Sequence, residues 1–143
     1  MNLLERAIIF AVEAHKGQLD KIGTAYVTHP LRVMMDCHTI VEQVVAVLHD
    51  TVEDTSATLE DIRNLCGGET IADTIVDAVE AITKREGEDY DLYLSRVKAN
   101  PISLSVKLAD IRDNMSPIRQ YRLPMEKQIK LKAKYLKALA ILQ

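Results

Sequence analysis

Aromatic residues and cysteines are scarce in this chain. Among its 143 residues there is no tryptophan and only one phenylalanine, although 48% of the residues are hydrophobic. The core is therefore expected to be mostly aliphatic, a composition that suits packed helices. The two cysteines, Cys37 and Cys66, lack CxxC spacing, and no secretory leader precedes them. This pattern predicts reduced thiols in a cytoplasmic protein.

Long apolar runs and a strong net charge are also missing. No run approaches the ~18 residues that a membrane-spanning helix needs, and the formal charge is -3 at pH 7. We therefore expect no membrane insertion and no attraction of the whole protein to nucleic acid or anionic lipid. The stretch from Lys127 to Lys137 is locally basic, and we interpret it as a solvated helix face.

Apolar residues recur at helical spacing along the chain, which predicts an all-α fold of roughly seven to nine helices. The length fits a single domain over residues 1–143. Pro30, Pro101 and Pro124 suit the first turns of three helices. In the last helix, one apolar stripe is expected to dock on the rest of the bundle. It consists of Ile129, Ala133, Leu136 and Ala140.

The most informative segment runs from Leu48 to Thr55, where ionisable side chains follow an apolar helical pattern. On one continuous helix, His49 and Glu53 would lie four residues apart, and Asp50 and Asp54 would repeat that spacing. The apolar residues just upstream place this helix in the interior, where unpaired carboxylates are costly. A divalent ion would compensate them, so the segment predicts a metal site.

Four blocks of the sequence resemble, in the same order, the HD-domain phosphohydrolases. The resemblance is nearest to the (p)ppGpp hydrolase domain of RelA/SpoT-like proteins and their single-domain relatives, including the metazoan SpoT homologues. It covers the chain from its start to about Gln120 and implies a compact HD-domain helical bundle. The blocks are Ala14-His15-Lys16-Gly17-Gln18, Tyr26-Val27-Thr28-His29-Pro30, Leu48 to Thr55, and Lys107-Leu108-Ala109-Asp110 with Asn114-Met115. We interpret His15 as a hydrogen-bonded structural residue.

The resemblance implies one divalent metal ion, expected to be manganese, with four protein ligands. These ligands are His29, His49, Asp50 and Asp110. It further implies that Glu53 and Asp54 lie beside the ion and activate or orient the attacking water. The chemistry agrees, because a metal lowers the pKa of bound water and a neighbouring carboxylate can accept its proton. Imidazole and carboxylate together suit manganese, iron or zinc.

By the same resemblance, we expect hydrolysis of the alarmones ppGpp and pppGpp, with metal-activated water releasing the 3′-pyrophosphate. The sequence has no phosphate-cradling P-loop and no glycine-rich dinucleotide motif. Substrate phosphates would therefore be held by the ion and by basic side chains such as Lys21, with Asn114 contacting the sugar or a phosphate. The expected partner is a small nucleotide, and since small helical hydrolases often self-associate, a homo-oligomer is compatible with the sequence.

Three departures from the family pattern leave the nucleotide open. The loop that commonly reads Arg-Lys-Ser-Gly is Asp20-Lys21-Ile22-Gly23 here, and Asp20 cannot stack on guanine as an arginine does, although it can accept hydrogen bonds from the guanine edge. The family's Asp-Arg-Leu-His-Asn-Met reads Asp110-Ile111-Arg112-Asp113-Asn114-Met115. Pro117 replaces a frequent threonine and lacks both its hydroxyl and its backbone donor.

Two alternatives to alarmone hydrolysis therefore stay open. The first is the same chemistry on another nucleotide, such as a nucleoside monophosphate or NADPH. The second is a nucleotide-binding regulator without turnover, against which the intact ligands and the Glu53-Asp54 pair both argue.

Overall fold

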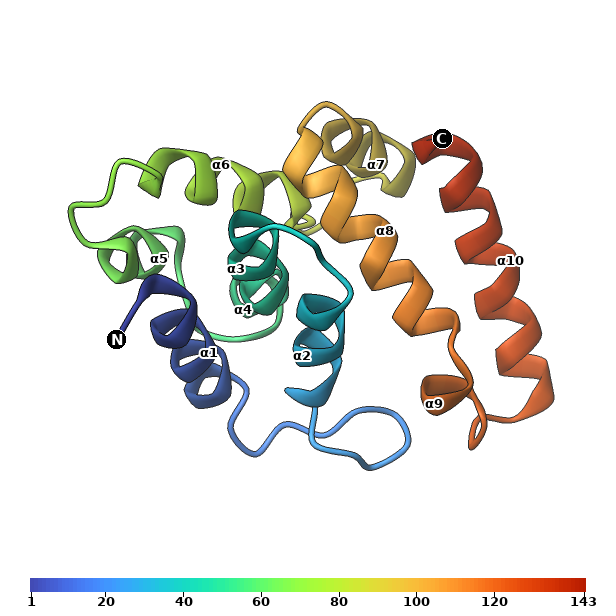
Figure 1. Cartoon of the computed structure of the whole chain (residues 1–143). Helices are drawn as coiled ribbons and strands as arrows, with labels where there is room; N and C mark the ends of the chain where they lie inside the picture. The colour runs from blue at the N-terminus through green and yellow to red at the C-terminus, as the bar shows by residue number, and fades with distance from the viewer.

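The computed structural model describes all residues, 1–143, and consists of helices without a β-sheet (Figure 1). Two of its ten helices, α4 and α9, are single turns of four residues, which leaves eight longer ones. The predicted all-α fold is confirmed. The helices are α1 (Leu3–Ala14), α2 (Thr28–Met35), α3 (Ile40–Leu48), α4 (Thr51–Asp54), α5 (Leu59–Cys66), α6 (Ala72–Ile82), α7 (Tyr90–Lys98), α8 (Pro101–Met115), α9 (Pro117–Gln120) and α10 (Met125–Leu142).

Local sequence signals account for several helix boundaries. Asn2 and Thr58 begin α1 and α5 with capping boxes, in which the side chain three residues later bonds back to the cap. Asn100 caps α8 by accepting a hydrogen bond from Ser103, and Pro101 occupies its first position. After α1 the chain reverses at Gly17, whose φ of 78° a glycine adopts without strain.

The buried apolar side chains form two clusters. The larger contains 19 residues, mainly from α1, α2, α3, α5 and α6. The smaller contains Tyr93, Leu94, Val97, Ile111, Ala138 and Leu142, from α7, α8 and α10. Helix α8 contributes to both clusters, and Figure 1 shows it running between α2 and α3 on one side and α10 on the other. Tyr93 is the only tyrosine or phenylalanine among the buried residues, so the core is aliphatic, as predicted.

Helix α10 docks through a different face from the predicted one. Ile129, Ala133, Leu136 and Ala140 are all exposed, so that prediction is wrong. The docked stripe is Tyr135, Ala138, Leu139 and Leu142. Both stripes have helical spacing, but the docked one removes more apolar surface from water, because two residues of the exposed one are alanines. None of the ten helices combines the length and hydropathy that a bilayer span requires.

The prediction of one continuous helix through the acidic segment is also wrong. Helix α3 ends at Leu48, α4 begins at Thr51, and His49 and Asp50 form a turn between them. His49 Nδ1 lies 2.6 Å from the carbonyl oxygen of Ala46, and the Thr51 hydroxyl donates to that of Leu48 at 2.8 Å. Side chains thus bond to carbonyls that a continuing helix would pair with its own N–H groups.

Candidate metal centre

Four side chains from three parts of the fold converge on one point. His29 lies in the first turn of α2, His49 and Asp50 form the turn between α3 and α4, and Asp110 lies in α8. One ligand atom of each residue lies within 4.8 Å of the other three. His29 Nε2 is 2.8 Å from Asp110 Oδ1, and His49 Nε2 is 3.1 Å from Asp50 Oδ2. The structure brings the four predicted ligands together.

His49 and Asp50 supply two ligands from neighbouring positions after α3. Neighbouring residues on an α-helix point about 100° apart around its axis, since a turn takes 3.6 residues. The two side chains nevertheless meet, with His49 Nε2 3.1 Å from Asp50 Oδ2 and 3.2 Å from Asp110 Oδ1. A buried helix end thus supplies two adjacent ligands.

The donor set and its spacing fit one divalent ion. Metal–ligand bonds of about 2.0 to 2.2 Å place donors on opposite sides of an ion roughly 4 Å apart, so a 4.8 Å cluster needs only a small contraction. Both imidazoles use Nδ1 elsewhere, His29 toward Asp113 and His49 toward Ala46, which leaves Nε2 facing the cluster. The cluster can hold a divalent metal ion.

The charges of the four side chains are coupled to one another and to Lys107 and Asp113. Burial opposes charge on His49, but Asp50 and Asp110 outweigh burial and hold its pKa well above the ordinary value. The pKa of His29 is likewise raised, because hydrogen bonds to Asp110 and Asp113 outweigh burial. For Asp110, Lys107 and the imidazoles outweigh burial and hold the carboxyl pKa well below its usual range. Protonated imidazoles thus compensate the buried carboxylates.

Glu53 and Asp54 lie in α4, at the open side of the cluster. Glu53 Oε1 accepts a hydrogen bond from the Lys84 amide at 2.8 Å. The Tyr26 hydroxyl donates to Asp50 Oδ2 at 2.6 Å and lies 3.4 Å from Asp54 Oδ2. Burial and the Asp50 carboxylate raise the pKa of Asp54 to about 6, and burial raises that of Glu53. Carboxylates with raised pKa values are better proton acceptors.

A pocket of about 420 Å³ adjoins the cluster, and five acidic and five cationic side chains line it. Its cationic residues are Lys21, Lys84, Lys107, Arg119 and Lys134. The sequence predicts no role for Lys84 or Arg119, and it predicts that Lys134 lies on a solvated helix face. Burial and the nearby Lys107 and Lys21 lower the pKa of Lys134, so this lysine belongs to the pocket. In the sequence, the only indication that Lys134 could bind an anionic ligand is its place in the basic stretch of α10.

The predicted substrate residues occupy different positions relative to the pocket. Lys21 and Asn114 line it, and the Asn114 amide donates to Asp110 Oδ1 at 3.3 Å. Asp20 also lines it, but its Oδ1 accepts hydrogen bonds from the amides of Ile22 and Thr24 at 3.0 and 2.9 Å. Asp20 therefore holds its own loop closed, and contact with guanine stays a prediction. His15 Nδ1 is 2.8 Å from Gln18 Oε1, which agrees with its structural interpretation.

Comparisons with known proteins place this geometry in context. No family model matches the sequence. The chain is 35% identical over 151 residues to a probable GTP pyrophosphokinase of Mycobacterium leprae, which covers 98% of this chain and 19% of that protein. It is 32% identical over 141 residues to a guanosine-3′,5′-bis(diphosphate) 3′-pyrophosphohydrolase of Aquifex aeolicus, covering 88% and 19%. Over nearly its whole length, the chain is similar to the HD domain of RelA/SpoT-like proteins.

The chain spans about a fifth of the length of the curated relatives it matches. A solved structure of a metazoan ortholog of SpoT that hydrolyzes ppGpp superposes with a TM-score of 0.79 at 22% identity. The superposition covers 100% of this chain and 86% of the other. The two proteins therefore share a fold over nearly their whole lengths.

Proposed function

We propose that this HD domain is a metal-dependent phosphohydrolase that removes the 3′-pyrophosphate of ppGpp and pppGpp. The observation that carries the proposal is the convergence of His29, His49, Asp50 and Asp110 at a pocket that several lysines and an arginine also line. The relationship to the Aquifex aeolicus pyrophosphohydrolase supports the choice of substrate. We expect manganese as the ion, because two imidazoles and two carboxylates suit an ion of intermediate hardness.

The residues around the cluster have separable roles. When bound, the ion supplies a Lewis acid that acidifies water and draws charge from the phosphoryl group. Lys107 donates to Asp110 Oδ2 at 2.9 Å, which keeps Oδ1 turned toward the imidazoles. Glu53 and Asp54 accept the proton of the attacking water or orient it. Tyr26 steadies this arrangement by bridging Asp50 and Asp54.

The remaining pocket cations suit a substrate with several phosphates. Lys21, Lys84, Arg119 and Lys134 line the pocket together with the metal cluster, and charge-assisted hydrogen bonds to phosphate oxygens are among the stronger polar contacts in proteins. The volume of about 420 Å³ lies within the usual range for small-ligand sites, about 300 to 1,000 Å³. We propose that these side chains hold the phosphates that are not attacked.

A substrate panel tests the proposal. The purified protein with manganese should release pyrophosphate from ppGpp and pppGpp, leaving GDP and GTP, and should leave NADPH and nucleoside monophosphates intact. Products are separated by anion-exchange chromatography, and His49→Ala controls for contaminating activity. Turnover of NADPH or nucleoside monophosphates alone would refute the alarmone assignment. Metal binding without turnover of any substrate would favour the nucleotide-binding regulator.

Metal binding should also release protons. The raised pKa values of His29 and His49 mean that both imidazoles stay protonated above the ordinary histidine value of about 6.5, and an ion must displace those protons. Manganese affinity should therefore weaken as pH falls. Titration calorimetry in two buffers with different ionisation enthalpies measures the released protons directly. Identical binding heats in the two buffers would contradict proton release.

A further inference from the structure

A second polar cluster lies behind His29, on the side of the ring away from the other ligands. His29 Nδ1 is 2.6 Å from Asp113 Oδ2, while Nε2 is 2.8 Å from Asp110 Oδ1. Asp110 and Asp113 lie nearly one turn apart on α8, so a single helix contacts both ring nitrogens. Since His29 is only 2% exposed, no water competes for either contact. The orientation of the ring is therefore fixed from both sides.

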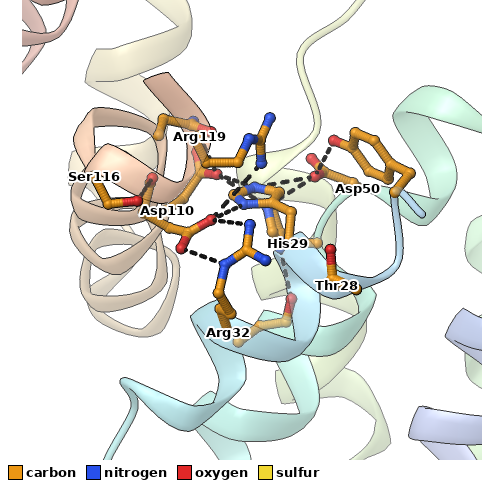
Figure 2. Close-up of polar contacts among 12 residues, drawn as sticks. Thr28, His29, Arg32, Asp50, Asp110, Ser116 and Arg119 are labelled. Carbon is orange, nitrogen blue, oxygen red and sulfur yellow. Dashed lines mark hydrogen bonds and ion pairs between the residues drawn. The ribbon is translucent and has the colours of Figure 1, made fainter. Parts of the chain in front are cut away.

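Arg32 fixes the Asp113 carboxylate in turn, and Arg119 adds a longer ion-pair contact. Arg32 of α2 donates from Nε to Oδ1 at 2.8 Å and from Nη2 to Oδ2 at 3.1 Å, a two-point contact that sets the plane of the carboxylate. Arg119 of α9 brings Nη1 to 3.7 Å from Oδ2. In Figure 2, Arg119 lies above His29 and Arg32 below it, while Asp50 lies to the right of the ring. The Asp113 carboxylate is thus held in place from α2.

We infer that Asp113 is a positioning residue for the metal centre, which holds the proton of His29 on Nδ1 so that the Nε2 lone pair points at the ion. A carboxylate in this position fixes the tautomer and makes the imidazole a stronger ligand. The inference rests on the proposed metal-dependent function. His49 differs, because the partner of its Nδ1 is the neutral carbonyl of Ala46.

A purely structural role for Asp113 is the alternative, because its contacts with His29 and Arg32 also join α2 to α8. Another ion pair between the same two helices provides a control for that alternative. Asp36 at the end of α2 pairs with Arg112 of α8, Nε to Oδ2 at 2.8 Å, in an exposed ion pair that does not touch His29. Asp36→Asn therefore removes a link between the same two helices without altering the metal cluster. Asp113→Asn keeps the size of the side chain but removes its charge. Because Arg32 retains the remaining oxygen, the new amide nitrogen faces His29 Nδ1 and favours the proton on Nε2.

The test compares wild type, Asp113→Asn and Asp36→Asn by manganese titration calorimetry and by ¹⁵N NMR of the metal-free histidine rings at a pH where they are neutral. We expect Asp113→Asn to weaken manganese binding about 10- to 100-fold. Because Asp113 and Asp110 compete for the proton of neutral His29 in the metal-free protein, the variant should also carry that proton on Nδ1 in a smaller fraction of molecules than wild type does. Asp36→Asn should change neither quantity. Equal affinities and an unchanged His29 tautomer in Asp113→Asn would overturn the inference.

Two further outcomes keep the test decisive. If wild type binds no manganese, the proposed function fails, whereas tight binding by both wild type and Asp113→Asn refutes only the role of Asp113. If Asp113→Asn does not fold, Arg32→Gln carries the test, because it frees the carboxylate while leaving its contact with His29. A larger loss of manganese affinity than in Asp36→Asn then supports the inference, and an equal affinity overturns it.

Discussion

Replacing His49 by alanine or Asp50 by asparagine should abolish metal retention. Each change removes one of four converging donors, and no other acidic or imidazole side chain belongs to the group that could hold the ion. Because a metal site needs its full ligand set, the remaining donors should bind manganese too weakly to survive dialysis. Elemental analysis of the dialysed proteins, together with titration calorimetry, measures the loss.

Matched controls separate ligand loss from general damage. His38 and Asp77 are exposed, so His38→Ala and Asp77→Asn delete the same chemical groups away from the cluster. Both control proteins should keep the metal content of wild type, and circular dichroism should show a folded helical protein in all four variants. Full metal occupancy in both His49→Ala and Asp50→Asn would refute the assigned coordination.

Glu53→Gln should leave metal binding intact and lower turnover by about two to four orders of magnitude. Glu53 lies outside the four-ligand group, so the ion keeps its donors. The glutamine oxygen can still accept the hydrogen bond from the Lys84 amide, which preserves the position of the side chain. What is lost is a negatively charged proton acceptor at the open side of the cluster. Initial rates of pyrophosphate release at saturating manganese, compared with manganese affinity, separate the two effects.

Glu60→Gln provides the control, because Glu60 is an exposed glutamate in the first turn of α5. Its rate should equal that of wild type. An unchanged rate in Glu53→Gln would remove Glu53 from the mechanism and leave Asp54 as the only neighbouring carboxylate. A joint loss of metal and turnover would instead place Glu53 among the ligands.

The sequence predicted the parts of the fold that depend on local signals. Asn100 with Pro101 marked the start of α8, and Thr58 with Asp61 formed the expected capping box. The turn at His49 and Asp50 was not predicted, because periodicity continues through it and the break depends on bonds from side chains to nearby carbonyls. The docked face of α10 was missed because two stripes satisfy the same spacing and only packing distinguishes them.

The candidate metal centre also combines residues that local sequence patterns connect with residues that they do not. Helical spacing could connect His49 and Asp50 with Glu53 and Asp54, but only the family resemblance connected His29 and Asp110, which lie 81 residues apart along the chain. Sequence analysis noted Asp113 as a departure from the family pattern without giving it a role. Its contacts with His29 and Arg32 depend on the packing of α2 against α8, which no local pattern predicts.

The two apolar clusters divide the molecule into parts that can vary separately. The ligands His29, His49 and Asp50 are anchored beside the larger cluster, whereas Tyr93, Lys134 and Tyr135 of the pocket wall belong to helices α7 and α10, which pack on the smaller one. Only α8, which carries Asp110, is common to both. Substitutions in α7 and α10 can therefore reshape the wall that meets the nucleotide while the metal ligands keep their places. Such a division lets substrate preference drift during evolution without loss of the hydrolytic centre.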